Sequence, residues 1–160
     1  MESIDLIDKK IALELGQDAL QRSDKIAKKL NISSATVRRR IRNLTQSGVV
    51  RIIGVVDPQI FGLPLASIIA LNITPDKINF AINEIAKRPE IRWVSTTTGR
   101  YSIIALGRFN SNDHLSDFIS RNLALLEGLK ECETFICLDM KKGHYVPFSF
   151  HRLFPDQQEI

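Results

Sequence analysis

Residues 23–46, which read SDKIAKKLNISSATVRRRIRNLTQ, decide the fold of the N-terminal part of this 160-residue chain. Apolar residues at helical spacing predict one helix that starts after Ser23 and runs to residue 30, and another over about residues 34–46. The triplet Asn31–Ser33 between them predicts a tight turn, and the hydroxyl of Ser33 can accept a backbone N–H of the helix that follows. Two helices joined by so short a turn indicate a helix-turn-helix.

The later of these helices has two unlike faces. Val37, Ile41 and Leu44 recur at i, i+4 and i+7 and form a narrow apolar stripe. The opposite face carries Ala35 followed by arginines. A small residue lets a helix enter the major groove closely, and an arginine can bind O6 and N7 of guanine or clamp a phosphate. We therefore expect this helix to bind double-stranded DNA.

The expected DNA contacts lie on both helices. The start and outer face of the later helix are expected to meet the major groove, and lysines of the earlier helix to hold phosphates, which position a protein without specifying a sequence. The set is Ser34, Ala35, Thr36, Arg38, Arg39, Arg42, Lys25, Lys28 and Lys29. Arg22 and, more weakly, Arg51 can add phosphate contacts.

Charge is concentrated in the same region. Residues 21–51 hold nine lysines and arginines against one acid, Asp24, whereas the whole chain carries a net charge of only +4. The plain alternative is a solvated basic face without a ligand. However, four exposed arginines, Arg38, Arg39, Arg40 and Arg42, repel one another, and a purely structural helix gains nothing from that repulsion. The pattern indicates a polyanionic partner.

The neighbouring segments complete an N-terminal domain expected over residues 1–55. A first helix is predicted, with Ser3 as its N-cap and Gly16 as its stop. The β-branched run over residues 49–56 predicts a short hairpin or wing. Proline and glycine then mark a linker over residues 56–64.

The remainder, residues 65–160, predicts a second domain. Apolar runs and turn residues indicate a strand, a helix, two strands, a helix and a strand. These elements are expected over residues 65–73, 76–87, 91–97, 101–109, 114–126 and 133–140. Their β-α-β-β-α-β order is the split pattern of a ferredoxin-like fold, so the chain is expected to be α+β. A weak internal echo, SIIAL at residues 67–71 and 102–106, falls on two of the strands.

The predicted strands are apolar on both faces. Their large residues are Ile68, Ile69, Leu71, Ile103, Ile104, Leu106, Phe135, Ile136 and Leu138. Only two helices are available, and in this split arrangement both cover the same face of the sheet. The other face predicts a second copy of the chain, because a large apolar patch is unfavourable in water. A dimer would also deliver two recognition helices to a pseudo-palindromic site.

Residues 27–44, together with Gly48-Val49-Val50, the opening residues 6–11 and the stretch from Val55 to Gly62, resemble the Lrp/AsnC (feast/famine) family. The resemblance spans essentially the whole chain and is strongest over residues 4–62. It implies a winged helix-turn-helix followed by a ligand-binding domain that forms dimers and often larger assemblies, such as tetramers or octamers. It also implies regulation by an amino acid or related metabolite, and binding near the regulator's own promoter.

The turn Gly99-Arg100-Tyr101-Ser102 is the expected effector site. The family usually has Gly-x-Tyr-Asp here, so Ser102 stands where an acid is expected. The missing carboxylate removes a partner for an effector's ammonium group. Arg100 could still pair with a carboxylate, and Tyr101 offers a ring face and a hydroxyl. The alternative is an ordinary hairpin turn with a solvated arginine.

Two other functions stay open at this stage. Siroheme (tetrapyrrole) decarboxylases share the two-domain architecture, but their Arg/His and Trp-Pro-Tyr-type sequences are missing from this chain. An architectural DNA binder without an effector is the other alternative, which Ser102 keeps open. No paired acid and base, glycine-rich phosphate loop or metal-ligand spacing is found, so neither enzyme activity nor a cofactor or metal is expected. His114, His144 and His151 are expected at the surface or in the tail.

The compartment is expected to be cytoplasmic. No apolar run approaches the roughly 20 residues that span a bilayer, so no membrane partner is expected. The opening residues lack the features of a signal peptide. Cys132 and Cys137, five apart in a predicted strand, would point to opposite faces and stay free. The aromatic tail at residues 148–154 is expected to pack on the body or on a neighbouring subunit.

Overall fold

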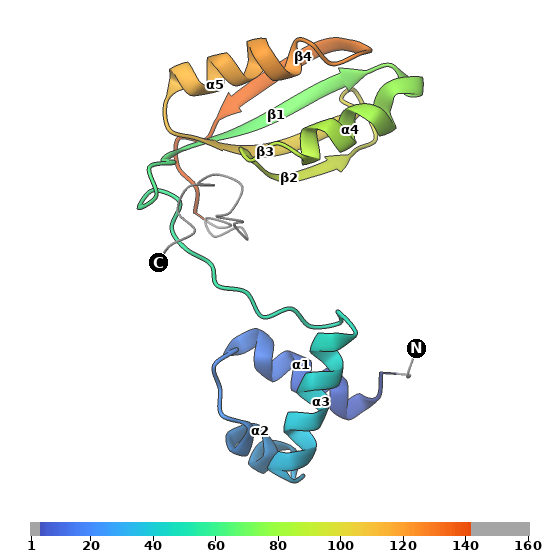
Figure 1. Cartoon of the computed structure of the whole chain (residues 1–160), viewed down its shortest axis with the longest axis vertical. Helices are drawn as coiled ribbons and strands as arrows, with labels where there is room; N and C mark the ends of the chain where they lie inside the picture. The colour runs from blue at the N-terminus through green and yellow to red at the C-terminus, as the bar shows by residue number, and fades with distance from the viewer. Residues whose placement is uncertain (1–3, 142–160) are drawn as a thin grey trace. The chain divides into compact units, whose positions relative to one another are not determined.

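A computed structural model describes residues 4–141 of the chain (Figure 1). The chain divides into two compact units, Met1–Gly54 and Val55–Ile160. Each unit has its own hydrophobic core. The two are therefore described one at a time.

The first unit consists of three helices, α1 (Leu6–Gln17), α2 (Ser23–Leu30) and α3 (Ser34–Gln46). The last two were predicted from residue periodicity, and the structure confirms both, with α2 beginning one residue earlier than predicted. Their apolar stripes meet in one core. Its buried members are Ile11, Leu15, Ile26, Ala27, Val37 and Leu44.

Local polar chemistry sets the ends of these helices. Ser33 caps α3 as predicted, because its Oγ accepts the N–H of Thr36 at 3.1 Å. Asn31 ends α2 in the left-handed conformation, with φ of 52°, which makes the turn tight. Two sequence expectations about α1 need correction. Its N-cap is Asp5, whereas the expected cap, Ser3, lies outside the described residues, and Gly16 does not stop the helix.

The hairpin predicted over residues 49–56 is not seen. Residues 47–64 form no strand. A hairpin needs two strands that pair with each other, and β-branched residues favour an extended chain without specifying a partner strand. Ile52 and Ile53 are half exposed as a result.

The second unit contains a four-stranded sheet and two helical segments. The strands are β1 (Leu65–Ile73), β2 (Ile91–Thr96), β3 (Ile103–Phe109) and β4 (Leu129–Ile136). After β1, a 3₁₀ turn, η1 (Pro75–Lys77), leads into α4 (Ile78–Ala86). After β3, α5 (Asn112–Phe118) continues into a π-helical turn, η2 (Ile119–Leu123). The predicted β-α-β-β-α-β order is confirmed.

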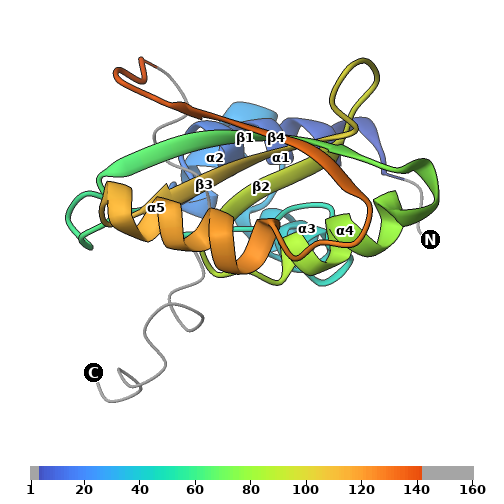
Figure 2. The same cartoon turned by 90° about the horizontal axis from the view of Figure 1, so that it is seen from above.

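The strands lie in the order β2-β3-β1-β4, and all neighbours are antiparallel. The two SIIAL segments pair with each other at the centre of the sheet, where Ile68 faces Leu106 and Leu71 faces Ile103. Both α4 and α5 cover the same face of the sheet (Figures 1 and 2). Ile69, Phe109 and Phe118 are buried between that face and the helices.

Several boundaries differ from the sequence expectation for local reasons. The last strand begins at Leu129, four residues earlier than predicted, because Leu129 and Cys132 pack against the helix-side core although Lys130 and Glu131 lie between them. The helix predicted from His114 starts at Asn112, since Ser111 caps it. Cys132 and Cys137 are free, as expected.

Candidate DNA-binding surface and effector turn

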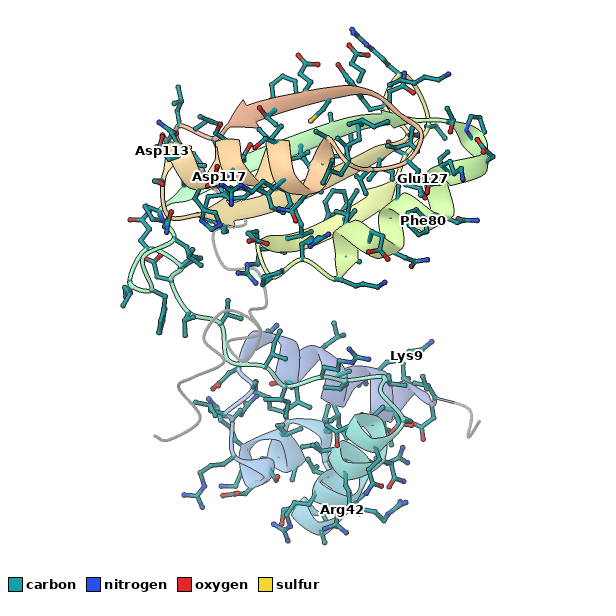
Figure 3. All side chains as sticks on the ribbon, turned by 45° about the horizontal axis from the view of Figure 1, so that its top comes forward. Lys9, Arg42, Phe80, Asp113, Asp117 and Glu127 are labelled. Atoms are coloured by element: carbon teal, nitrogen blue, oxygen red, sulfur yellow. The ribbon has the colours of Figure 1, made fainter. Side chains whose placement is uncertain are left out.

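α3 is held to its domain along one side only. Val37 and Leu44 are buried and Ile41 is half-buried, in agreement with the predicted stripe. The opposite side, with Ala35, Arg38, Arg39 and Arg42, is exposed. Figure 3 shows Arg42 on the outer surface of the three-helix unit. Three guanidinium groups thus project from the exposed side of a helix whose other side is buried in the three-helix core.

The start of α3 is already engaged in its own cap. Thr36 shares a hydrogen bond with the Ser33 hydroxyl, with 2.8 Å between the two oxygens. Thr36 and Ser34 are partly buried, whereas Ala35 is exposed. Of the three residues expected near the groove at this end, Ala35 is therefore the most accessible.

Arg40 differs from the other arginines of α3, which corrects the expectation of four exposed guanidinium groups. Its side chain is only 20% exposed. Its Nη1 donates to Asp5 Oδ2 and to Asp8 Oδ1, both at 2.7 Å, at the start of α1. These contacts raise the pKa of Arg40, through hydrogen bonds to Asp8 first and Asp5 second. Sequence spacing alone could not reveal this, because the partners lie more than thirty residues away.

The lysines expected to hold phosphates differ in their surroundings. Lys25 and Lys28 are exposed on α2. Lys29 forms an ion pair with Glu14 of α1, which also accepts a hydrogen bond from Gln21. Both bonds lower the pKa of Glu14, that from Lys29 most. A phosphate at Lys29 would therefore have to compete with the carboxylate of Glu14.

The turn expected to bind an effector is closed by partners from the chain itself. Arg100 forms an ion pair with Glu131, and its guanidinium carbon lies 5.2 Å from the centre of the Tyr101 ring. The Tyr101 hydroxyl donates to Glu133, and this bond is the main cause that raises the pKa of Tyr101. Gly99 has φ of 107°, so the turn itself requires a glycine.

Ser102 is part of the sheet rather than a free ligand. Its Oγ accepts the N–H of Ile73 at 2.9 Å, and its hydroxyl lies 3.3 Å from the carbonyl oxygen of Leu71. Sequence reasoning missed Glu131 and Glu133, which supply the carboxylates at this turn. Only the register of β4 beside β1, with Glu131 opposite Asn72, could have identified them.

Two family models match the chain. One, described as the Lrp/AsnC ligand binding domain, covers residues 67–147, and the other, a winged helix-turn-helix DNA-binding domain, covers residues 4–51. The chain belongs to the Lrp/AsnC family. It therefore carries the DNA-binding and ligand-binding domains of these transcriptional regulators.

Relatives support this Lrp/AsnC assignment over nearly the whole chain. A helix-turn-helix-type transcriptional regulator of Pyrococcus furiosus is 30% identical over 143 residues, which are 89% of this chain and 96% of that protein. Another, from Methanocaldococcus jannaschii, is 27% identical over 146 residues, or 90% and 99% of the two chains. The relatives are thus named as regulators and not as enzymes.

Solved structures share the fold. The Escherichia coli AsnC structure matches with a TM-score of 0.77 and 22% identity, over 88% of this chain and 96% of that one. A regulator from Neisseria meningitidis, solved as a complex with L-methionine, matches with a TM-score of 0.75 and 18% identity, over 94% and 99%.

The sheet face opposite α4 and α5 is apolar and open in this Lrp/AsnC chain. The strand register places four large residues in one row across the sheet. They are Trp93 of β2, Leu106 of β3, Ile68 of β1 and Phe135 of β4. Trp93, Ile68 and Phe135 are each 39–50% exposed. This open-face row is the second apolar face that the sequence indicates.

Neither a metal site nor a membrane segment is found in residues 4–141. No three His, Cys, Asp or Glu side chains there come together to hold a metal ion. His114 lies against Glu90, 3.4 Å from Nε2 to the carboxylate, and His144 and His151 lie outside the described residues, as does the aromatic tail. No helix in the same part of the chain is both long and apolar enough to cross a bilayer.

Proposed function

We propose that this chain is a sequence-specific, DNA-binding transcriptional regulator that acts in the cytoplasm as a homodimer or larger assembly. Its DNA affinity responds to an amino acid or related small metabolite. The observation that carries the DNA-binding part is α3: one side is buried in the three-helix core, and the other presents Arg38, Arg39 and Arg42 to solvent. We assign DNA binding to residues 1–55, a linker to residues 56–64, and sensing and assembly to residues 65–160.

In this proposal α3 enters the major groove and α2 holds the backbone. Arg39 and Arg42 are assigned to base edges, since their guanidinium groups lie on the side opposite the buried stripe. Arg38, Lys25 and Lys28 are assigned to phosphates or the groove edge. Ser34, Ala35 and Thr36 approach the groove at the helix start, and Lys29 contributes less because Glu14 already neutralises it.

The dimer rests on the open-face row. Four apolar side chains from four strands form a continuous band, which is the kind of surface that a second copy covers. A two-fold arrangement also suits two half-sites of an operator.

The effector is assigned to the turn Gly99–Ser102. The L-methionine complex of the Neisseria protein supports an amino acid as the ligand class. Here the ligand carboxylate would replace Glu131 at Arg100, and the freed Glu131, together with the neighbouring Glu133, would take its ammonium group. One observation favours a second candidate, an architectural DNA binder without an effector. The charged group of the turn, Arg100, is already paired with Glu131 of β4.

Selection of bound duplexes from a random pool tests the DNA-binding proposal. The full chain is expected to enrich one pseudo-palindromic sequence and to bind it at least about a thousandfold more tightly than scrambled DNA. Equal affinity for both would contradict sequence-specific regulation.

A thermal-shift screen against amino acids and keto acids then separates the two candidates, since only a sensor is stabilised by its ligand.

A further inference from the structure

Asp5, Asp8 and Arg40, which we call the α1–α3 clamp, form a hydrogen-bond network between the start of α1 and the middle of α3. Asp5 Oδ1 accepts the N–H of Asp8 at 2.8 Å, and Asp8 Oδ2 accepts the N–H of Asp5 at 3.1 Å. This reciprocal pair is the capping box that starts α1. The remaining oxygen of each carboxylate receives Nη1 of Arg40 at 2.7 Å. All four carboxylate oxygens are thereby used.

The clamp lies where it can fix the pose of α3. Arg40 comes from the middle of α3, directly after Arg39, and reaches the first turn of α1. Its side chain is 20% exposed and that of Asp8 is 16% exposed, so water screens the pair less than it screens a surface ion pair. Apolar contacts alone permit small rotations of a helix about its stripe, but directed hydrogen bonds to two fixed carboxylates restrict them.

The charge of Arg40 is also taken out of the basic surface. Two carboxylates face its guanidinium, whereas Arg39 and Arg42 are exposed. A phosphate that approached Arg40 would have to compete with the two carboxylates already bonded to its Nη1. Arg40 is thus placed to hold α3 and not to contact DNA.

We infer that Arg40 is a positioning residue for DNA recognition: bound to Asp5 and Asp8, it sets how α3 presents Arg39 and Arg42 to the bases. The inference rests on the proposed DNA-binding function. Within residues 38–42, which read RRRIR, Arg40 bonds α1, whereas the other three arginines are exposed to solvent.

The test compares Arg40→Met with Lys28→Met in the full chain, on the selected duplex and on random DNA. Lys28→Met removes a proposed phosphate contact, so the slope of log K against log salt is expected to fall by about 0.9 while the ratio of specific to random binding stays the same. Arg40→Met is expected to leave the slope unchanged and to lower the ratio of specific to random binding by about tenfold, comparable to one lost base contact. A reduced slope with an unchanged ratio for Arg40→Met would overturn the inference.

Asp5→Asn gives a second, milder variant, because asparagine is itself a good N-cap and keeps the start of α1. It is expected to lower the binding ratio in the same direction as Arg40→Met, and the two changes together should cost less than the sum of their separate losses. Additive losses would count against the clamp.

The two single variants and the double variant are also compared by thermal unfolding without DNA, which tests the clamp separately from the proposed function. Non-additive shifts of the unfolding midpoint for Arg40→Met and Asp5→Asn support the clamp, and additive shifts overturn it. If the unaltered chain showed neither sequence preference nor salt dependence, the proposed function would fail instead, and with it the role of Arg40 in DNA recognition.

Discussion

Ser102 combines an acceptor and a donor in one small side chain. Its Oγ accepts the Ile73 N–H, and its hydroxyl can donate to the carbonyl oxygen of Leu71 or Ile73. Ser102→Ala is expected to lower the free energy of unfolding by about 1–2 kcal/mol, because it leaves the Ile73 N–H without an acceptor. Chemical denaturation measures this, with the exposed Ser116→Ala as control. An unchanged midpoint for Ser102→Ala would show that the bond is not needed.

Single residues were predictable from sequence where their neighbours along the chain decide their role. The cap at Ser33 and the stripe of Val37 and Leu44 depend on spacing alone, and both are confirmed. The roles of Arg40 and Tyr101 depend on Asp8 and Glu133, each about thirty residues away. No local pattern carries that information, because tertiary packing creates these pairs.

The start of α1 depends on ionised carboxylates, which makes it sensitive to acid. The pKa of Asp5 lies below its ordinary value of 3.8, chiefly through the bond from the Asp8 N–H and next through Arg40. Because the folded pKa is the lower one, the stabilisation is present above the ordinary pKa and disappears as the pH falls through the lowered value.

The unfolding midpoint of the unaltered chain should therefore exceed that of Asp5→Asn near neutral pH, and the gap should close as the pH falls below about 4. A thermal melt series over pH measures the difference. A gap that stays constant down to the most acidic buffer would show that the charge of Asp5 contributes nothing.

The loop into β4 depends on Gly128. Its φ is +79°, and an added Cβ would lie 2.9 Å from Cβ of Lys77 as well as against Thr74. Gly99 is a matched comparison, since its φ is +107° but nothing lies within 4 Å of an added Cβ. Gly128→Ala should cost about 1–3 kcal/mol more in unfolding free energy than Gly99→Ala, because steric overlap adds to backbone strain. Equal costs by chemical denaturation would contradict this packing.

Helices and strands were predictable in proportion to how local their signals are. α3 and β1 have the predicted bounds and α2 differs from them by one residue at its start, since periodicity and caps or turns agree there. The wing was not found, because β-branched residues indicate an extended chain but not a partner strand. β4 begins four residues earlier than the predicted strand and includes Glu131 and Glu133. Charged residues are not typical of strands in a sequence, but an edge strand with one open face tolerates them.

At the scale of the whole molecule, the open-face row is expected to hold a dimer together. Ile68→Asp places a charge in the centre of that row and should give a monomer at micromolar concentration in sedimentation experiments. Leu125→Asp is the control, because Leu125 is 77% exposed and follows η2 on the helix side of the sheet. A monomeric unaltered chain, or an Ile68→Asp variant that remains dimeric, would refute the proposed interface.

The two-domain α+β architecture was predictable because the order of elements admits few topologies, and the antiparallel order β2-β3-β1-β4 is the one expected for a split β-α-β-β-α-β unit. The exposed arginines of α3 were predictable because helical periodicity determines which residues lie opposite the apolar stripe. The acids that close the effector turn were not, because they belong to a strand distant in sequence.

The most direct test of DNA recognition by α3 is a salt titration of binding, by fluorescence anisotropy, to the selected duplex and to random DNA. We expect affinity to fall steeply with salt on both. Arg39→Ala or Arg42→Ala should cost about 1–3 kcal/mol on the selected duplex alone and relax base preference in each half-site, whereas Lys28→Ala should weaken binding to both about equally. A flat salt dependence, or equal losses on both duplexes for all three variants, would contradict the assignment of α3 as the helix that reads DNA.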